Sequence, residues 1–123
     1  MSTAFRRVIP IMRIFDVDRA KQFYVDYLGF TVEFEHRFEE GMPLYMGISR
    51  DGLVLHLSEH HGDGSPGVTV YVEADGVRAL HDELKAKDYA YLRPGIEEDE
   101  FGVGLTLLDP FGNRLRVVEP PSP

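Results

Sequence analysis

The chain has 123 residues, of which 43% are hydrophobic and 28% are charged, as expected for one globular domain. Its formal net charge of −8 disfavours nucleic acid and anionic membranes as partners, and its apolar runs are too short for a transmembrane helix. Cysteine is absent, which excludes disulfides and thiolate chemistry. Because the N-terminus has no hydrophobic signal region, we expect a cytoplasmic protein.

The first half of the chain is predicted to contain a strand, a helix and three more strands. Residues 7–14 are mostly apolar and β-branched, which favours a strand. Asp16 or Asp18 can cap a helix, whose apolar residues recur at helical spacing until Gly29 ends it. Further strands are predicted at 30–35, 44–48 and 53–58, with a loop at 39–43 and a hairpin turn at Asp51-Gly52.

The second half repeats this order after a Gly-, Ser- and Pro-containing linker at 60–67. The pattern predicts a strand at 68–72, a helix at 75–87 and a short strand at 89–92. An acidic loop is expected at 97–100. A closing hairpin with strands 104–108 and 115–118 follows, and the proline-rich tail 120–123 is expected to be irregular.

Two segments about sixty residues apart are similar to each other. Residues 52–59 align with residues 112–119, and each segment follows a turn that contains aspartate. This repeat predicts two similar modules, about 7–59 and 67–119, within a single domain spanning 1–123. Two copies of so long a unit are too few for a solenoid.

Two motifs resemble the vicinal oxygen chelate superfamily, which includes glyoxalase I, extradiol dioxygenases and bleomycin-resistance proteins. The first motif is Asp16 followed by residues 23–30 (FYVDYLGF), and the second is residues 108–115 (LDPFGNRL). The resemblance implies an α+β fold of two tandem βαβββ modules, each a half-open mixed-strand barrel, that form a ligand cleft. It also implies a homodimer. The fold does not fix the reaction, because this superfamily hosts unrelated chemistries.

The resemblance also locates the positions at which metal-dependent members carry their ligands. These positions fall at Ile9, His56, Pro66 or Gly67, and Arg116. Only His56 can donate to a metal, and Arg116 would repel a cation. A divalent site needs several preorganised N or O ligands. We therefore expect no metal and no other cofactor.

Other polar residues give weaker indications of chemistry. The serines lack a glycine-flanked elbow, so no catalytic residue is assigned. His60 and His61 beside Asp63 could hold a metal, but a solvated linker is the simpler interpretation. The carboxylates at 97–100 are interpreted as a solvated run or as an acidic rim for a cationic ligand. His56 either faces the cleft or is a hydrogen-bonded structural histidine.

Among metal-free members, the chain resembles the bleomycin-resistance proteins, small acidic dimers that sequester a drug without altering it. They often carry a tryptophan that stacks on the ligand, whereas this chain has no tryptophan and has Phe101 in the matching stretch. The expected function is thus binding of a small, drug-like molecule, with bleomycin-like molecules as the candidates. The alternative is a metal-dependent lyase or isomerase of the glyoxalase type, and a scaffold without a ligand is a third possibility. The predicted ligand-binding residues are Phe38, Tyr45, His56, Phe101 and Arg116.

Overall fold

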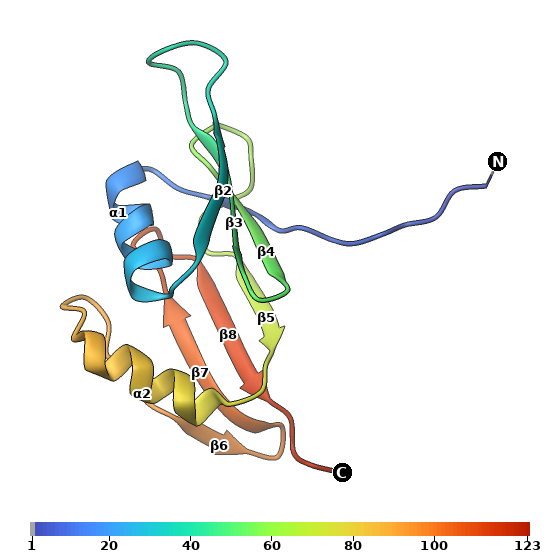
Figure 1. The fold of residues 1–123 in the computed structure, drawn as a ribbon, viewed down its shortest axis with the longest axis vertical. Coiled ribbons are helices and arrows are strands. Elements are labelled where there is room, and N and C mark those ends of the chain that lie inside the picture. The colour runs from blue at the N-terminus through green and yellow to red at the C-terminus, as the bar shows by residue number, and fades with distance from the viewer. Residues whose placement is uncertain (1) are drawn as a thin grey trace.

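The structure is a computed structural model that describes residues 2–123, so Met1, which the predicted domain includes, lies outside the described residues. The chain forms two four-stranded sheets, each accompanied by a helical segment (Figure 1). In chain order the elements are β1 (Ile11–Arg13), α1 (Val17–Lys21), the π-helical continuation η1 (Gln22–Tyr27), β2 (Thr31–His36), β3 (Tyr45–Arg50), β4 (Leu53–Ser58), β5 (Thr69–Glu73), α2 (Val77–Lys87), β6 (Glu97–Asp99), β7 (Gly102–Leu108) and β8 (Arg114–Glu119).

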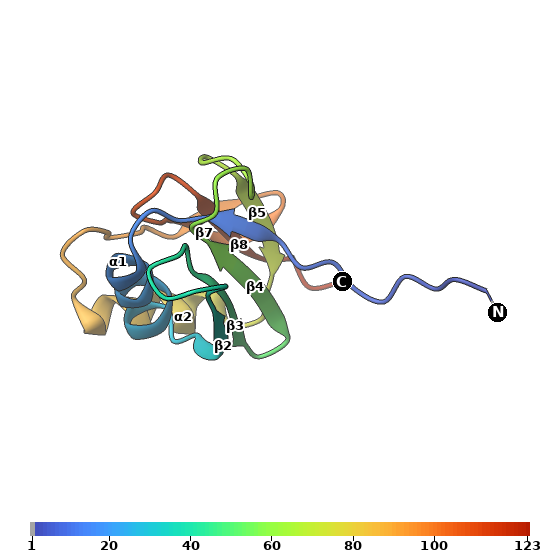
Figure 2. The same cartoon turned by 90° about the horizontal axis from the view of Figure 1, so that it is seen from above.

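The two sheets share one topology. Sheet 1 has the order β1-β4-β3-β2 and sheet 2 has the order β5-β8-β7-β6. In each sheet the first strand runs parallel to the fourth, and the other neighbours are antiparallel. Figures 1 and 2 show both helices on one side of the sheets. The predicted α+β fold of two half-open βαβββ modules is confirmed.

The core lies between the sheets and the helices. Alternation along each fourth strand sends one set of side chains inward, Leu55 and Leu57 from β4 and Leu115 and Val117 from β8. The opposite side chains of these strands, including His56 and Arg116, lie on faces that point away from the helices. The helices contribute the buried residues Ala20, Phe23, Tyr24, Tyr27, Val77 and Leu84.

The turn between β7 and β8 ties the two halves together. Asp109 is buried there and accepts hydrogen bonds from the Asn113 backbone N–H (2.8 Å) and from the Tyr24 hydroxyl of η1 (2.7 Å). Burial, and then the negative charge of Asp109, raise the pKa of Tyr24, so its hydroxyl stays a donor. The Asn113 side chain also donates to the Arg13 carbonyl oxygen (2.8 Å), which anchors β1 to the second half.

Three predicted elements differ from the structure. The first strand covers only Ile11–Arg13 rather than 7–14, because Pro10 has no N–H to extend the ladder. The predicted strand at 89–92 is wrong, since this segment is irregular and the Tyr89 ring stacks on Tyr27 with centroids 4.5 Å apart. The predicted acidic loop is also wrong in part, because Glu97–Asp99 forms β6, the edge strand of sheet 2.

The terminal segments contain no helix or strand within the described residues. Residues 2–10 extend away from the body of the molecule (Figures 1 and 2), and the tail 120–123 is irregular, as its prolines predict. Across residues 2–123, none of the helices combines the length and the apolar character that crossing a bilayer requires.

Candidate ligand-binding faces

The open face of sheet 1 is the side of β1–β4 that points away from the helices. His56 of β4 pairs with Gly47 of β3, which in turn pairs with Phe34 of β2. A side chain at Gly47 would collide with the Phe34 ring, so the glycine lets that ring lie flat across the sheet. The Phe34 ring meets His56 edge-on at 5.3 Å and stacks with Tyr45 at 6.2 Å.

Tyr45 and His56 form a hydrogen-bonded pair on this face. The Tyr45 hydroxyl lies 2.6 Å from His56 Nδ1. Desolvation, and then the positive charge of Arg7, lower the pKa of His56, which favours the neutral imidazole. Burial, and then the charge of Asp63, raise the pKa of Tyr45, so the phenol keeps its proton. The pair is therefore neutral, with the tyrosine placed to donate to the histidine.

Phe38 lies beyond this pair in the loop that follows β2. Its side chain is 73% exposed, and its ring packs edge-on against His36 (4.9 Å) and His60 (6.0 Å). Phe38 thus continues a row of aromatic and imidazole rings along the upper edge of sheet 1.

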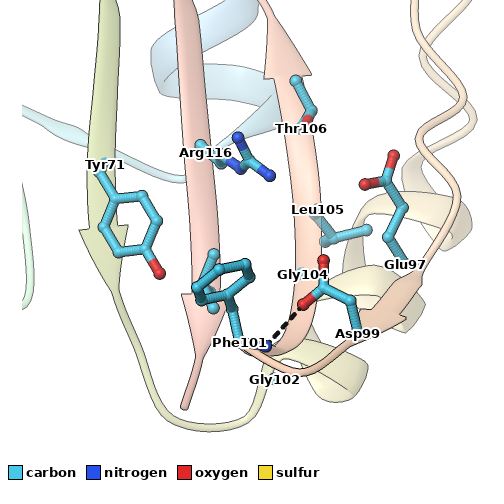
Figure 3. A pocket seen from close by; sticks show the side chains of 10 residues that line it. Tyr71, Glu97, Asp99, Phe101, Gly102, Gly104, Leu105, Thr106 and Arg116 are labelled. Carbon is cyan, nitrogen blue, oxygen red and sulfur yellow. Dashed lines mark hydrogen bonds between the residues drawn. The ribbon is translucent and has the colours of Figure 1, made fainter.

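The open face of sheet 2 carries a cavity of about 180 Å³, drawn in Figure 3. Arg116 of β8 lies at its centre and pairs in register with Tyr71 of β5 and Thr106 of β7. Arg116 forms no salt bridge with any residue in the range 2–123. The cavity is lined only by residues between Tyr71 and Val118, all from the second module.

The edge strand β6 supplies carboxylates to the same cavity. Glu97 and Asp99 line it, while Glu98 between them pairs with Arg78 of α2 on the other side of the strand. Asp99 Oδ1 accepts a hydrogen bond from the Phe101 backbone N–H (2.8 Å), which fixes the turn that carries the Phe101 ring. Phe101 is 64% exposed and borders the cavity.

The five predicted site residues therefore fall into two groups. Phe38, Tyr45 and His56 gather on sheet 1, whereas Phe101 and Arg116 line the cavity of sheet 2. Sequence reasoning missed Phe34 and Tyr71. Tyr71 could have been found from the repeat, because it is the first-strand neighbour of Arg116 just as Ile11 is the neighbour of His56.

The metal site of the superfamily does not fit these residues. His56 pairs in register with Ile11 and Gly47, which offer no side-chain donor. The equivalent fourth-strand position in sheet 2 is the cationic Arg116. Among residues 2–123, no three His, Asp or Glu side chains are grouped so that they could hold a metal ion. We therefore derive no chemistry through a metal.

The duplicated βαβββ architecture with open sheet faces defines the class of fold. The family model described as glyoxalase superfamily protein matches residues 1–122, so the chain belongs to the glyoxalase superfamily. A search among curated proteins found no match.

Solved structures with this fold include drug-binding proteins and glyoxalase-family proteins. The bleomycin-binding protein of Streptomyces verticillus, solved with copper(II)-bleomycin, is 27% identical, with a TM-score of 0.70 over 98% of this chain and 100% of that chain. The antibiotic-binding protein TnmS3 from Streptomyces sp. CB03234 is 19% identical, with a TM-score of 0.71 over 97% of this chain and 100% of that chain. A glyoxalase-family protein from Enterococcus faecalis is 14% identical, with a TM-score of 0.69 over 94% and 98% of the two chains.

Proposed function

We propose that this protein binds a small, drug-like molecule without a metal ion and holds it chemically unaltered, as bleomycin-resistance proteins do. The observation that carries the proposal is the pair of exposed rings, Tyr71 and Phe101, beside the cavity of sheet 2. Exposed rings next to a hollow provide a stacking surface for a planar ligand. The 27% identity to a protein solved with copper(II)-bleomycin supports the same class of ligand.

We further propose that the complete site forms in a homodimer. The aromatic group on sheet 1 and the cavity on sheet 2 use different faces of one chain, so a second copy could bring one against the other. Phe34, Phe38, Tyr71 and Phe101 are all substantially exposed, and such apolar patches mark interaction surfaces. Light scattering should give a mass of about 28 kDa, twice the 14.0 kDa chain, and a monomer at micromolar concentration would contradict the dimer. We also propose that the protein binds this ligand in the cytoplasm.

The glyoxalase-type enzyme remains the competing function, because the family includes metal-dependent members. The donor set argues against it, since His56 is engaged by Tyr45 and the equivalent position is Arg116. We expect no stoichiometric Zn²⁺, Ni²⁺, Mn²⁺ or Fe²⁺ after dialysis. Elemental analysis that finds one divalent ion per chain, lost in His56→Ala, would favour the enzyme.

Calorimetric titration with metal-free bleomycin and with copper(II)-bleomycin tests the binding function. We expect saturable binding and an unchanged drug on recovery. Phe101→Ala should weaken binding about ten- to hundred-fold, or roughly 1–3 kcal/mol, because it removes a stacking surface. Tyr91→Ala is the matched control, since Tyr91 is an exposed ring of similar size that does not line the cavity. If neither form of bleomycin binds, bleomycin-type drugs are excluded as ligands.

A further inference from the structure

The cavity of sheet 2 holds opposite charges that do not pair with each other. Arg116 comes from β8, whereas Glu97 and Asp99 come from β6, and all three line the same space. Within residues 2–123, none of them forms a salt bridge. Some cations of this acidic protein do find carboxylates, as Arg50 does with Glu83 and Arg78 does with Glu98. In the cavity, by contrast, a cation and carboxylates that form no salt bridge within residues 2–123 line the same space.

The order of strands explains why these charges stay apart. Strand β7 lies between β6 and β8, so Glu97 and Arg116 are two strand spacings apart, about 10 Å at the backbone. They also lie in different rows, because Glu97 pairs with Gly104 whereas Arg116 pairs with Thr106. Figure 3 shows the Arg116 guanidinium reaching from β8 toward β7, with the Glu97 carboxylate on the far side of β7.

Gly104 leaves the floor between these charges open. A side chain there would meet the Val117 carbonyl oxygen at 3.4 Å and a Val118 methyl at 3.6 Å, which are ordinary contacts, so the fold does not require glycine at this position. Gly102 differs, because its φ is +124° and a side chain there would collide with the Glu119 carbonyl oxygen, so this position does require glycine. Backbone geometry therefore does not explain glycine at position 104, whose missing side chain leaves the cavity floor open.

The edges of the cavity are aromatic. Tyr71 lies beside Arg116 on the neighbouring strand, and Phe101 lies at the end where β7 begins. A flat molecule placed over Gly104 would thus meet a ring at two edges, a guanidinium at one end and carboxylates at the other.

We propose that this cavity selects planar molecules that carry both an acidic and a basic group. The acid would bind Arg116, whose planar guanidinium can donate two parallel hydrogen bonds to a carboxylate. The base would bind Glu97 and Asp99, and the ring system would lie against Tyr71 and Phe101. The inference rests on the proposed ligand-binding function and specifies the charge pattern of its ligand. A cavity of about 180 Å³ holds one such fragment, which can be part of a larger molecule.

Four para-substituted benzenes of similar size, which differ in charge, test this proposal on the full-length protein. 4-(Aminomethyl)benzoate carries a carboxylate and an ammonium group at opposite ends of its ring, 4-methylbenzylamine only the positive group, 4-ethylbenzoate only the negative group, and 4-ethyltoluene neither. Affinities can be measured by the protein amide shifts in NMR titrations at low salt. We expect 4-(aminomethyl)benzoate to bind about two- to fivefold more tightly than either singly charged compound, because each charge completes a separate, solvent-exposed ion pair.

Two charge-removing variants should then each remove one half of this preference. Arg116→Gln should remove the advantage of 4-(aminomethyl)benzoate over 4-methylbenzylamine, while Glu97→Gln should reduce its advantage over 4-ethylbenzoate. Arg114→Gln and Glu100→Gln make the same changes in net charge outside the cavity lining and should leave the affinities unchanged. Gly104→Val should weaken all four compounds by filling the floor.

Each outcome bears on the proposal separately from the binding function. Equal affinities for 4-(aminomethyl)benzoate and 4-methylbenzylamine, or an order of affinities that Arg116→Gln does not change, would overturn the charge pattern. Bleomycin binding without binding of any of the four benzenes would also overturn it while leaving the proposed function intact. If neither the benzenes nor the drugs bind, both proposals are rejected.

Discussion

The open faces of the two sheets differ although the strands beneath them are arranged identically. His56 and Arg116 occupy equivalent positions in β4 and β8, next to Ile11 and Tyr71 in the respective parallel strands. On sheet 1 the polar atoms satisfy each other, through the 2.6 Å contact between Tyr45 and His56. On sheet 2 the charges of Arg116 and Glu97 stay apart around a cavity.

The difference arises from which side chains cover the open face of each sheet. On sheet 1, Phe34 covers the position that Gly47 leaves free, and the rings contact one another. On sheet 2 the position equivalent to Gly47 is Thr106, and Gly104, two residues earlier on the same face, has no side chain, so open space and unpaired charge remain. The polar groups of sheet 1 are therefore preformed and paired, whereas those of sheet 2 stand open, as the proposed ligand-binding function requires.

The largest expected effect is a loss of stability, and it should differ between substitutions on the two sides of sheet 2. Leu84 of α2 is 1% exposed within the core, so Leu84→Ala should destabilise the fold by roughly 2–5 kcal/mol. Phe101→Ala on the open face should change stability by less than about 0.5 kcal/mol. Equilibrium urea unfolding measures both changes. If the two variants unfold equally easily, Phe101 is a packing residue and the open face of sheet 2 is not a free surface.

The next effect compares the closing turns of the two modules. Asp109 is buried and accepts from the Tyr24 hydroxyl and from Asn113, so Asp109→Asn should destabilise by roughly 2–4 kcal/mol, since an amide cannot accept all these bonds. Asp51 lies in an exposed turn with φ of +53°, a conformation that asparagine tolerates, so Asp51→Asn should cost less than about 0.5 kcal/mol. Similar losses in the two variants would mean that the Asp109 turn does not join the modules as described.

Sequence patterns predicted most of this architecture because its main signals are local. Helical spacing, the Asp16 cap and the repeated turn segments all depend on residues close together in the chain, and the corresponding helices and hairpins formed. Strand β6 could not be predicted in this way. Its three acidic residues are polar and short, and they become a strand only by pairing with Gly102, Val103 and Gly104.

Which side chains reach the open faces depends even more strongly on the register of strand pairing than the presence of the strands does. Alternation from Val32 would place Phe34 in the core, but an irregularity between these residues shifts the pairing, so that Val32 faces Ile48 and Phe34 faces Gly47. This bulge moves Phe34 to the open face, which no local pattern indicated. The motif alignment did select His56 and Arg116, because the repeat fixes equivalent positions without knowledge of the register.

Matched tyrosine variants give a smaller effect that compares the faces directly. Tyr45→Phe removes the hydrogen bond to His56 and should destabilise the protein by about 0.5–1.5 kcal/mol. The Tyr71 hydroxyl has no hydrogen-bond partner within the described part of the chain, so Tyr71→Phe should be close to neutral. Thermal unfolding at one protein concentration resolves the two. The preformed character of sheet 1 would be refuted if Tyr45→Phe were also neutral.

The smallest expected effect is electrostatic and concerns His56. Its pKa should lie below the ordinary 6.5 in the folded protein, since desolvation and then Arg7 disfavour the charged ring. The unfolded chain then binds more protons than the folded chain between the two pKa values. The contribution of His56 to stability is therefore fully present above about 6.5, and it falls with pH until the folded pKa is reached. A titration of the imidazole C–H resonances measures this pKa directly.

Substitution at the N-terminal segment tests the cause of that shift. Arg7→Gln should move the pKa of His56 upward, because it removes a positive charge that opposes protonation. Arg6→Gln removes the same charge one residue earlier and should leave the pKa of His56 unchanged. Added salt should reduce the difference between the two variants, because ions screen exposed charges. A His56 pKa above 6.5 would contradict the lowered pKa as a whole, and equal shifts in both variants would show that Arg7 does not act on the open face of sheet 1.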